Sequence, residues 1–249
     1  MGAHELRIRP LVGLPEIGEG DDLGRLIAEA AAPGGEEIVV LSQKVVSKAE
    51  GRLRRLAEVE PDARALELAE ELGRDPALVE LILEESKALL RAERGVLITE
   101  TRQGWVCANA GIDASNLEPG WVSLLPLDAD RSARAIRRQI EAASGSLPAV
   151  VIADSFGRAW RLGQADVAIG CAGIAPLADW RGRRDARGNE LSATLIATAD
   201  ELAAAADLSR EKDAGVPGAI IAGLAGLVSE EDGPGAAAIR RPASEDLFR

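Results

Sequence analysis

The chain has few of the side chains that enzymes use as nucleophiles and bases, and few aromatic residues. Its 249 residues include one histidine (His4), two cysteines, two phenylalanines, four tryptophans and no tyrosine. A Ser–His or Cys–His hydrolase needs a well-placed histidine, and His4 stands near the start of the chain, where the backbone is often loosely held. That class of hydrolase is therefore disfavoured, and the hydrophobic core must be built from Ala, Val, Leu and Ile.

Cysteine pairs of the kind that bind zinc are also absent. Cys107 and Cys171 lie far apart in the sequence and belong to no Cys-x-x-Cys motif. Neither a zinc site nor a disulfide framework is indicated. We expect Cys107, which stands in an apolar, strand-like run, to be a small core residue.

Positive charge is scarce. The chain has 41 acidic residues and 29 Lys and Arg residues, which gives a formal net charge of −12. Non-specific binding to nucleic acids or anionic membranes needs a basic surface, so neither partner is expected. No apolar run approaches the ~20 residues that span a bilayer, and no signal-peptide pattern precedes the first predicted strand. We therefore expect a cytoplasmic protein.

Two common phosphate-binding motifs are missing. Residues 13–18 have the glycine spacing of a P-loop, but Glu19 stands where a P-loop requires lysine, and an acidic residue there would repel phosphate. No Gly-x-Gly-x-x-Gly motif follows a predicted strand, so a Rossmann dinucleotide site is not supported. A nucleotide, if one binds, must be held by a less common arrangement.

The apolar pattern predicts a mixed α/β (α+β) fold. We expect residues 1–249 to form a single large domain of mixed sheets and flanking helices, with 229–249 as its C-terminal tail; a bilobed arrangement is left open. Strands are predicted over 5–12, 37–42, 96–101, 105–108, 121–125, 149–153, 166–171, 191–197 and 217–222. Helices are predicted over 23–32 with Asp21 as cap, 62–72, 76–94, 130–143, and from Thr198 or Asp200 to Leu208.

The most informative segment is residues 154–161, which follows the apolar run 148–153. A buried strand that ends in a carboxylate presents that group at the C-terminal edge of a parallel sheet, where ligands bind. Asp154 and Ser155 offer hard oxygen ligands for Mg²⁺ or Mn²⁺, and the arginines at 158 and 161 suit phosphate or carboxylate. The alternatives are a capped turn and surface arginines.

Arginines gather in two further places. Arg134, Arg137 and Arg138 share helical spacing and, with Arg131, fit a solvated helix face. A second group lies in an aperiodic stretch that contains glycine, where either a ligand-binding loop or an exposed loop fits; it comprises Arg181, Arg183, Arg184 and Arg187.

Two other segments can contribute to an anion or metal site. Residues 43–51 follow a buried strand and carry Lys44, Ser47 and Lys48, which could meet phosphate or form a lysine-rich surface turn. The polar loop 109–116 holds Asp113, the second carboxylate that a metal site with Asp154 would need. A solvated connection with Asx-turns is the alternative for this loop.

Together these segments resemble one family, the coenzyme F420:L-glutamate ligases. The resemblance covers nearly the whole chain in the right order and rests on residues 13–22, 45–51, 108–116, 154–161, 179–185 and 240–249. It implies an enzyme that uses GTP and a divalent metal, Mg²⁺ or Mn²⁺, to add L-glutamate to the deazaflavin precursor F420-0 and to extend the product through γ-linkages. The implied route phosphorylates a substrate carboxylate, and the glutamate amine then attacks the acyl phosphate. Such a route needs no nucleophilic Ser, Cys or His.

The resemblance also implies site residues at matching positions. Asp113 and Asp154 would bind metal, with Ser155 at a second metal and Glu211 as a further metal-proximal residue. Lys48 would be the charge partner of the transferring phosphoryl group, and contacts to GTP would come from Leu14, Pro15, Glu16, Ile17, Gln43, Lys48 and Asn116. To these we add Arg158 and Arg161 for the anionic precursor or glutamate, because they follow Asp154. A monovalent cation such as K⁺ is a further candidate cofactor, and a homodimer is the implied assembly.

The chain departs from the family pattern in two places. Ser155 replaces the more usual threonine and keeps the hydroxyl, and residues 209–212 are shorter and more charged than is usual. Because the chain ends at Arg249, we expect it to lack the flavin-binding reductase domain that continues some bacterial relatives. Two alternative functions stay open: a metal-dependent phosphotransferase or hydrolase acting on a phosphorylated metabolite, and a non-catalytic nucleotide-binding module.

Overall fold

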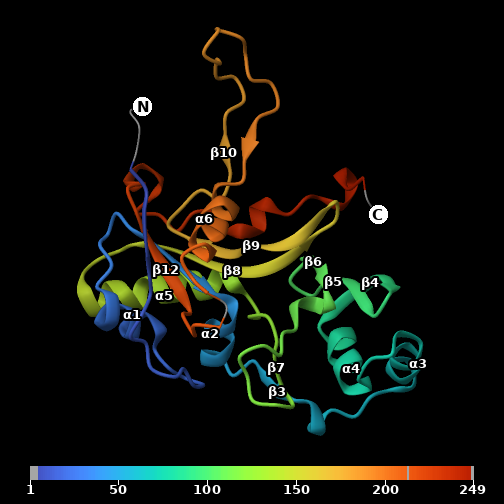
Figure 1. The fold of residues 1–249 in the computed structure, drawn as a ribbon. Coiled ribbons are helices and arrows are strands. Elements are labelled where there is room, and N and C mark those ends of the chain that lie inside the picture. Colours follow the sequence, from blue (N-terminus) through green and yellow to red (C-terminus); the bar gives the residue numbers. More distant parts are fainter. Residues whose placement is uncertain (1–4, 212, 248–249) are drawn as a thin grey trace.

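The computed structural model describes residues 5–211 and 213–247 and has a mixed α/β fold with several sheets (Figure 1). The main sheet has five strands, in the order β1 (Arg7–Pro10), β12 (Gly218–Ala222), β2 (Ile38–Ser42), β8 (Ala149–Arg158) and β9 (Arg161–Ala172). β2 and β8 are parallel, and the other neighbours are antiparallel. The predicted fold class is confirmed. His4 lies outside the described residues.

The central strands are buried on both faces because their sequences are apolar at every position. The four residues Ile38 to Leu41 have no exposed surface. Side chains alternate along a strand, so Val39 and Leu41 enter one hydrophobic cluster and Ile38 and Val40 another. Helices α1 (Leu23–Ala31) and α5 (Ala129–Ser144) supply the first cluster, and α6 (Thr198–Asp207) supplies the second. The main sheet is therefore a layer between helices (Figure 1).

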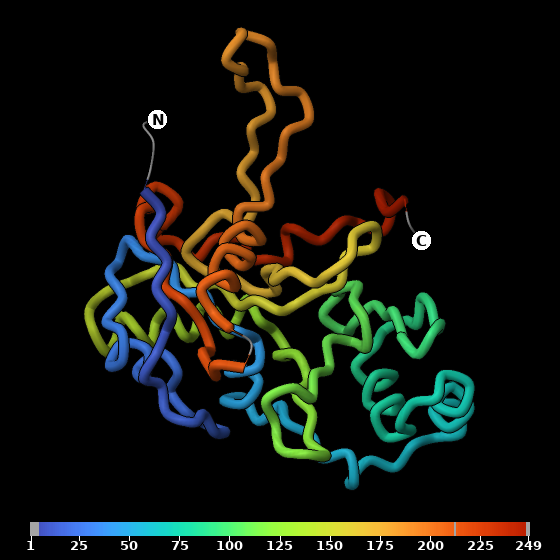
Figure 2. The backbone as a smooth tube through the Cα atoms, in the orientation of Figure 1, coloured from blue at the N-terminus to red at the C-terminus, as the bar shows by residue number. Residues whose placement is uncertain are grey.

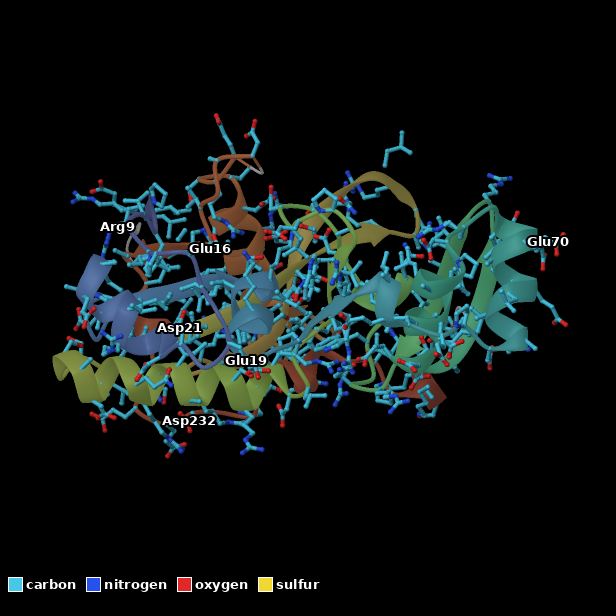
Figure 3. The ribbon with its side chains drawn as sticks, turned by 90° about the horizontal axis from the view of Figure 1, so that it is seen from below. Arg9, Glu16, Glu19, Asp21, Glu70 and Asp232 are labelled. Carbon is cyan, nitrogen blue, oxygen red and sulfur yellow. The ribbon has the colours of Figure 1, made fainter. Side chains whose placement is uncertain are left out.

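Residues 53–123 form what we call the small lobe, drawn in cyan and green in Figure 1. It contains β3 (Leu53–Arg55), α3 (Ala63–Leu72), α4 (Pro76–Glu84), β4 (Ser86–Glu93), β5 (Val96–Thr101), β6 (Val106–Ala108) and β7 (Trp121–Ser123). Its own hydrophobic cluster joins the two helices to the β4-β5-β6 sheet through Ala69, Ile82 and Leu97. Figure 3 shows Glu70 of α3 at the end of the molecule far from Glu16. Cys107 is buried, as predicted.

Two predicted elements differ from the structure. The predicted helix 76–94 ends at Glu84, because residues 86–93 pair with β5 as a strand. Within segment 43–51, for which a surface turn was one alternative, residues 43–49 form α2 (Gln43–Ala49); the Ser42 hydroxyl caps it by accepting a hydrogen bond from the Lys44 backbone N–H at 3.4 Å. Pairing with β5 makes residues 86–93 a strand, and the Ser42 cap favours the helix that follows it. The spacing of apolar residues reveals neither interaction.

Helix caps and one strand also need correction. Asp22, not Asp21, caps α1, while Asp21 accepts from the Gly18 N–H at 2.8 Å and steadies the preceding loop. Neither Thr198 nor Asp200 caps α6 through its side chain; Asp200 instead accepts from the Ala168 N–H in β9 at 2.9 Å. The predicted strand 191–197 shrinks to β11 (Leu195–Ile196), paired with β10 (Ala178–Asp179).

Arg137 contradicts the prediction of a solvated arginine face on α5. Its side chain is buried, whereas that of Arg138 is exposed. Arg137 donates hydrogen bonds to the carbonyls of Ser229 and Glu230 and, at 3.0 Å, to the carboxylate of Asp232, which Figure 3 shows beside the helix. The C-terminal tail covers this part of the helix, so a residue that helical spacing places on the surface holds the tail to the body.

The segment that contains β10 and β11 extends away from the body as an arm (Figure 2). It carries the second arginine group, Arg181, Arg183, Arg184 and Arg187, all exposed. Arg181 pairs with Asp179 at 2.6 Å, and Arg183 lies 4.3 Å from the centre of the Trp180 ring. A ligand-binding role for these arginines stays a prediction. Across the described part of the chain, no helix is long and apolar enough to cross a membrane.

Candidate active site

A cavity of about 480 Å³ lies beside the ends of β2 and β8. Its lining comes from segments far apart in the sequence, namely parts of 14–17, 42–48, 113–116, 153–155 and 207–217, together with Asp166. The loop before α1, the start of α2, the small lobe, the β8–β9 hairpin and the segment after α6 thus meet at one place. A site assembled from so many elements is where a fold of this class binds ligands.

The parallel pairing of β2 and β8 explains why the lining segments meet. Ser42 pairs with Ala153 at the last position of the ladder, and Asp154 follows directly. Asp154 therefore lies at the sheet edge that the sequence predicts. The predicted strand end at Ala153 is wrong, however, because β8 continues to Arg158 as one arm of a hairpin with β9.

The residues that the family resemblance assigns to GTP or metal all line this cavity: Leu14, Pro15, Glu16, Ile17, Gln43, Lys48, Asp113, Asn116, Asp154, Ser155 and Glu211. Arg158 and Arg161 do not line it. They are exposed near the turn of the hairpin, where the Arg158 Nη2 donates to the Leu162 carbonyl at 2.6 Å. The structure thus leaves these two arginines outside the cavity of their own chain, and the roles of all these residues stay predictions.

Asp154, one of the carboxylates that line the cavity, has a strongly raised pKa. Burial raises its pKa to about 7, and the nearby negative charges of Asp113 and Asp166 add to that rise. A hydrogen bond from the Ser155 backbone and the charge of Lys44 act in the opposite direction. A cation placed beside Asp154 would favour its ionised form.

Asp113 is held by Lys44 and Ser115. The Lys44 Nζ lies 2.9 Å from Asp113 Oδ2 and donates to both the carbonyl and the hydroxyl of Ser115 at 2.7 Å. Burial alone would raise the pKa of Asp113, but the hydrogen bonds from Lys44 and Ser115 outweigh it and lower that pKa. The polar loop is therefore ordered around its carboxylate, and the Asx-turn expected as an alternative is present, since the Ser115 N–H donates to Asp113 at 2.7 Å.

Lys48 lies one helical turn after Lys44, so both lysines can serve one side of α2. The Lys48 Nζ pairs with Glu16 Oε1 at 2.5 Å; the Lys48 side chain is 17% exposed and that of Glu16 is 85% exposed. Ile17 packs into the core beside the main sheet, which fixes the loop that carries Glu16. Gln43 is buried and accepts from the Ser47 hydroxyl at 2.8 Å. Lys48 is thus available at the cavity with one exposed carboxylate as its partner.

Asp166 and Arg210 line the cavity, although no sequence motif points to either residue. Asp166 is 5% exposed and accepts from the Ser155 hydroxyl at 2.6 Å and from Arg210 Nη2 at 2.7 Å. The β8–β9 register places Ser155 opposite Asp166. Recognising that residues 154–158 continue the strand would have paired these two residues, whereas nothing in the sequence links Arg210 to them.

The donor set suits a hard divalent cation without forming a complete site. Within residues 5–211 and 213–247, no group of three or more His, Cys, Asp or Glu side chains is arranged to hold a metal by itself. Asp113 and Asp154 are nevertheless close enough for the charge of one to raise the pKa of the other. Seven carboxylates and three cationic side chains line the described cavity, so an anionic ligand there would need added positive charge.

Comparison with known proteins agrees with the resemblance. Residues 12–223 match the family described as F420-0:Gamma-glutamyl ligase. A Coenzyme F420:L-glutamate ligase from Methanothermobacter thermautotrophicus is 45% identical over 243 residues, which cover 95% of this chain and 96% of that one. One from Methanopyrus kandleri is 45% identical over 250 residues (100% and 99%), and one from Archaeoglobus fulgidus is 41% identical over 247 residues (98% and 96%). Since the matched range includes every cavity-lining segment, the chain belongs to the F420-0:gamma-glutamyl ligase family.

Proposed function

We propose that this protein is a ligase of coenzyme F420 biosynthesis that joins L-glutamate to F420-0 and extends the product through γ-linkages, with GTP and a divalent metal. One observation carries the proposal: a single cavity of a chain in this family brings together two lysines and the paired carboxylates Asp113 and Asp154. The relatives that match over nearly the whole chain bear the name Coenzyme F420:L-glutamate ligase.

GTP is the co-substrate in this proposal. Residues 14–17, Gln43 and Asn116 contact the nucleotide, and Lys48 faces the transferring phosphoryl group, since an ammonium group stabilises the charge that develops there. Lys48 and Glu16 form an ion pair at 2.5 Å, and Glu16 is mostly exposed, so a bound phosphate can replace it as the partner of Lys48 at little cost.

Asp113 and Asp154 would hold the metal, with Ser155 and Glu211 at a second position, and K⁺ is a further candidate. A bound Mg²⁺ or Mn²⁺ supplies positive charge against the phosphates. The excess of carboxylates in the cavity and the raised pKa of Asp154 support this assignment. Among the described residues Asp113 pairs with the Lys44 ammonium at 2.9 Å and with no arginine, so a divalent cation would take a position beside that pair.

The proposed route needs no nucleophilic side chain. A substrate carboxylate oxygen takes the γ-phosphoryl group of GTP, which leaves GDP and an acyl phosphate. The amine of L-glutamate then attacks the acyl carbon, and phosphate departs as the amide bond forms. The protein's part is to position three anionic molecules and neutralise their charge, which fits a cavity whose reactive groups are lysines and carboxylates.

We further propose that the protein forms a homodimer through the turn of the β8–β9 hairpin and acts in the cytoplasm. Trp160 is 80% exposed and Leu162 is 97% exposed at this turn, and both flank the two arginines that lie outside the cavity. The two side chains are two residues apart on one turn, and a second copy that covered them would bury an exposed apolar patch. Light scattering should give twice the mass of one chain, and a monomer mass would reject the assembly.

The experiment that tests the function is mass spectrometry of F420-0 incubated with the protein, GTP, L-glutamate and Mn²⁺, with each component omitted in turn. Mass increments of one or more glutamyl units that vanish without GTP or metal support the ligase and count the additions. Phosphate release without an increment would favour the phosphotransferase or hydrolase. Tight GTP binding without turnover would favour the nucleotide-binding module.

A further inference from the structure

Asp166 is a buried carboxylate with two different partners. Oδ1 accepts from the Ser155 hydroxyl at 2.6 Å, and Oδ2 accepts from Arg210 Nη2 at 2.7 Å. Both partners line the cavity, but they come from different elements: Ser155 from the hairpin and Arg210 from the chain after α6. Asp166 therefore joins the hairpin of the main sheet to that later segment beside the cavity.

Arg210 belongs to what we call the wall segment, residues 207–211 and 213–217, which supplies one side of the cavity. The backbone hydrogen bonds described for residues 209–214 are local: Ser209 bonds back to Ala206, Arg210 to Asp207 and Ala214 to Glu211. Leu208 is 90% exposed, so it adds little packing. At its far end the Ser42 N–H of β2 donates to the Pro217 carbonyl at 2.8 Å, so the part around Arg210 is the part that depends on side-chain contacts for its place against the sheet.

The side chain of Arg210 provides such a contact. It is 7% exposed, pairs with Asp166 and lies 3.7 Å from Asp207 Oδ1. Its Nε is buried and has no hydrogen-bond acceptor among the described residues. An acceptor on a bound ligand would satisfy that donor, which makes the arrangement more costly without a ligand than with one.

We propose that Asp166 is a positioning residue, whose ion pair with Arg210 holds the wall segment at the cavity and whose second oxygen orients the Ser155 hydroxyl. A buried ion pair contributes little net stability, but removing one partner leaves an uncompensated charge. The pair therefore acts mainly on the position of the wall segment. The proposal's kinetic consequences rest on the proposed ligase function, whereas its structural consequences do not.

Hydrogen–deuterium exchange of the ligand-free protein tests the structural part. Asp166→Asn and Arg210→Gln should each raise amide exchange in the wall segment about tenfold, because each strands one member of the buried pair. The double variant should exchange no faster than either single variant, since both changes remove the same interaction. Ser155→Ala removes the other hydrogen bond of the same carboxylate and is the matched control; its wall segment should exchange as in the wild type.

Wild-type exchange in both Asp166→Asn and Arg210→Gln would overturn the proposal, as would an increase spread evenly over the chain. Arg210→Lys keeps a cation that can still pair with Asp166, so its wall segment should exchange close to the wild type. If the neutral single variants do not fold, Arg210→Lys is compared with Arg210→Lys combined with Asp166→Asn: faster exchange confined to the wall segment of the double variant would support the proposal, and equal exchange in the two would overturn it.

Kinetics separates the two oxygens of Asp166, because asparagine can still accept from the Ser155 hydroxyl but cannot pair with Arg210. Asp166→Asn and Arg210→Gln should raise a substrate KM by about tenfold with kcat within about twofold, whereas Asp166→Ala should also lower kcat. Equal kcat losses in Asp166→Asn and Ser155→Ala with unchanged KM would contradict this division. If the wild type ligates nothing, the proposed function fails, and the exchange experiment still decides the role of Asp166.

Discussion

The β8–β9 hairpin contains two regions with opposite surroundings. The root, residues 149–155 and 166–172, lies in the main sheet, and Ile152 within it has no exposed surface. The tip, residues 158–163, carries Trp160 and Leu162, which are 80% and 97% exposed. A strand advances about 3.3 Å per residue, so Arg158 lies about 13 Å along the chain from Asp154. Neighbours in a sequence motif are therefore not neighbours at a site when the motif is a strand.

The same contrast applies to Arg137 and Arg138, which are adjacent in α5. One is buried against the C-terminal tail, and the other is exposed. In α5 and in the hairpin alike, an arginine predicts a charged or polar partner, but the tertiary structure decides which group that partner is. Four predictions sharpen the comparison between root and tip.

The largest effect is expected from Asp154→Asn at the root. Removing this carboxylate should lower the rate of glutamyl addition on the order of a thousandfold, because the site loses a group that holds the cation against the phosphates. The fold should persist, since the substitution removes a carboxylate whose ionised form is disfavoured there. Turnover is measured by mass spectrometry and folding by circular dichroism. Wild-type turnover would reject the metal assignment.

The pH dependence of stability should also depend on Asp154. Its folded pKa of about 7 lies above the ordinary value of 3.8, so the folded state binds more protons than the unfolded state between these pH values. The free energy of unfolding should therefore fall as pH rises through that window, by about 4 kcal/mol from this group, and stay level above it.

Denaturant unfolding in EDTA at pH 4 to 8 measures this dependence, and the difference between the wild type and Asp154→Asn isolates it from other groups. Mn²⁺ added at pH 8 should restore stability to the wild type more than to the variant. An identical pH profile for the two proteins would show that Asp154 titrates normally.

Truncating a side chain should lower the free energy of unfolding more at the root than at the tip, and this effect is smaller than those expected for Asp154. Ile152→Ala should lower the free energy of unfolding by about 3 kcal/mol, because a buried side chain leaves a cavity in a packed core. In the single chain, Leu162→Ala should change it by less than about 0.5 kcal/mol, since that side chain is almost fully exposed there. Chemical denaturation over a range of protein concentrations compares the two. The loss in the Leu162 variant should grow at concentrations where the chain is dimeric, because the proposed homodimer covers the tip; a small loss at every concentration would count against that interface.

Complementation can show whether the tip acts on the cavity of a second copy. Arg161→Gln should leave the stability of the chain unchanged, yet it should lower turnover if the predicted role of Arg161 is correct. Equal amounts of Arg161→Gln and Asp154→Asn chains, unfolded and refolded together, should then recover about a quarter of wild-type activity, because half of the dimers are mixed and each has one intact site. No recovery would place Arg161 outside the second cavity.

Parts of the fold were predictable because the local pattern of apolar residues is enough to identify them. The four-residue apolar run in β2 fits only a buried strand, and the spacing of α5 fits only a helix with one covered side. Residues 86–93 were predicted as helix because their apolar residues continue the helical spacing of the preceding segment, whereas in the structure they form β4 and Leu89 packs against the small-lobe core. Pairing with β5 decided between helix and strand.

The candidate site likewise has residues that the sequence predicts and residues that it does not. The residues predicted to bind GTP and metal each lie within a short motif that resembles a family, and all of them line one cavity. Asp166 was not found, because a single acidic residue in a strand has no signal of its own. Its importance depends on the partners that the hairpin register and the wall segment bring to it.

The sequence alone determined the fold class, the family and many of the residues that line the cavity, because strand runs, helical spacing and short motifs are local properties of the chain. The tertiary structure alone decided that Arg137 is buried, that Arg158 and Arg161 lie outside their own chain's cavity and that Asp166 joins Ser155 to Arg210. The reason is physical: burial and pairing depend on which distant segments pack together, and local spacing does not specify that.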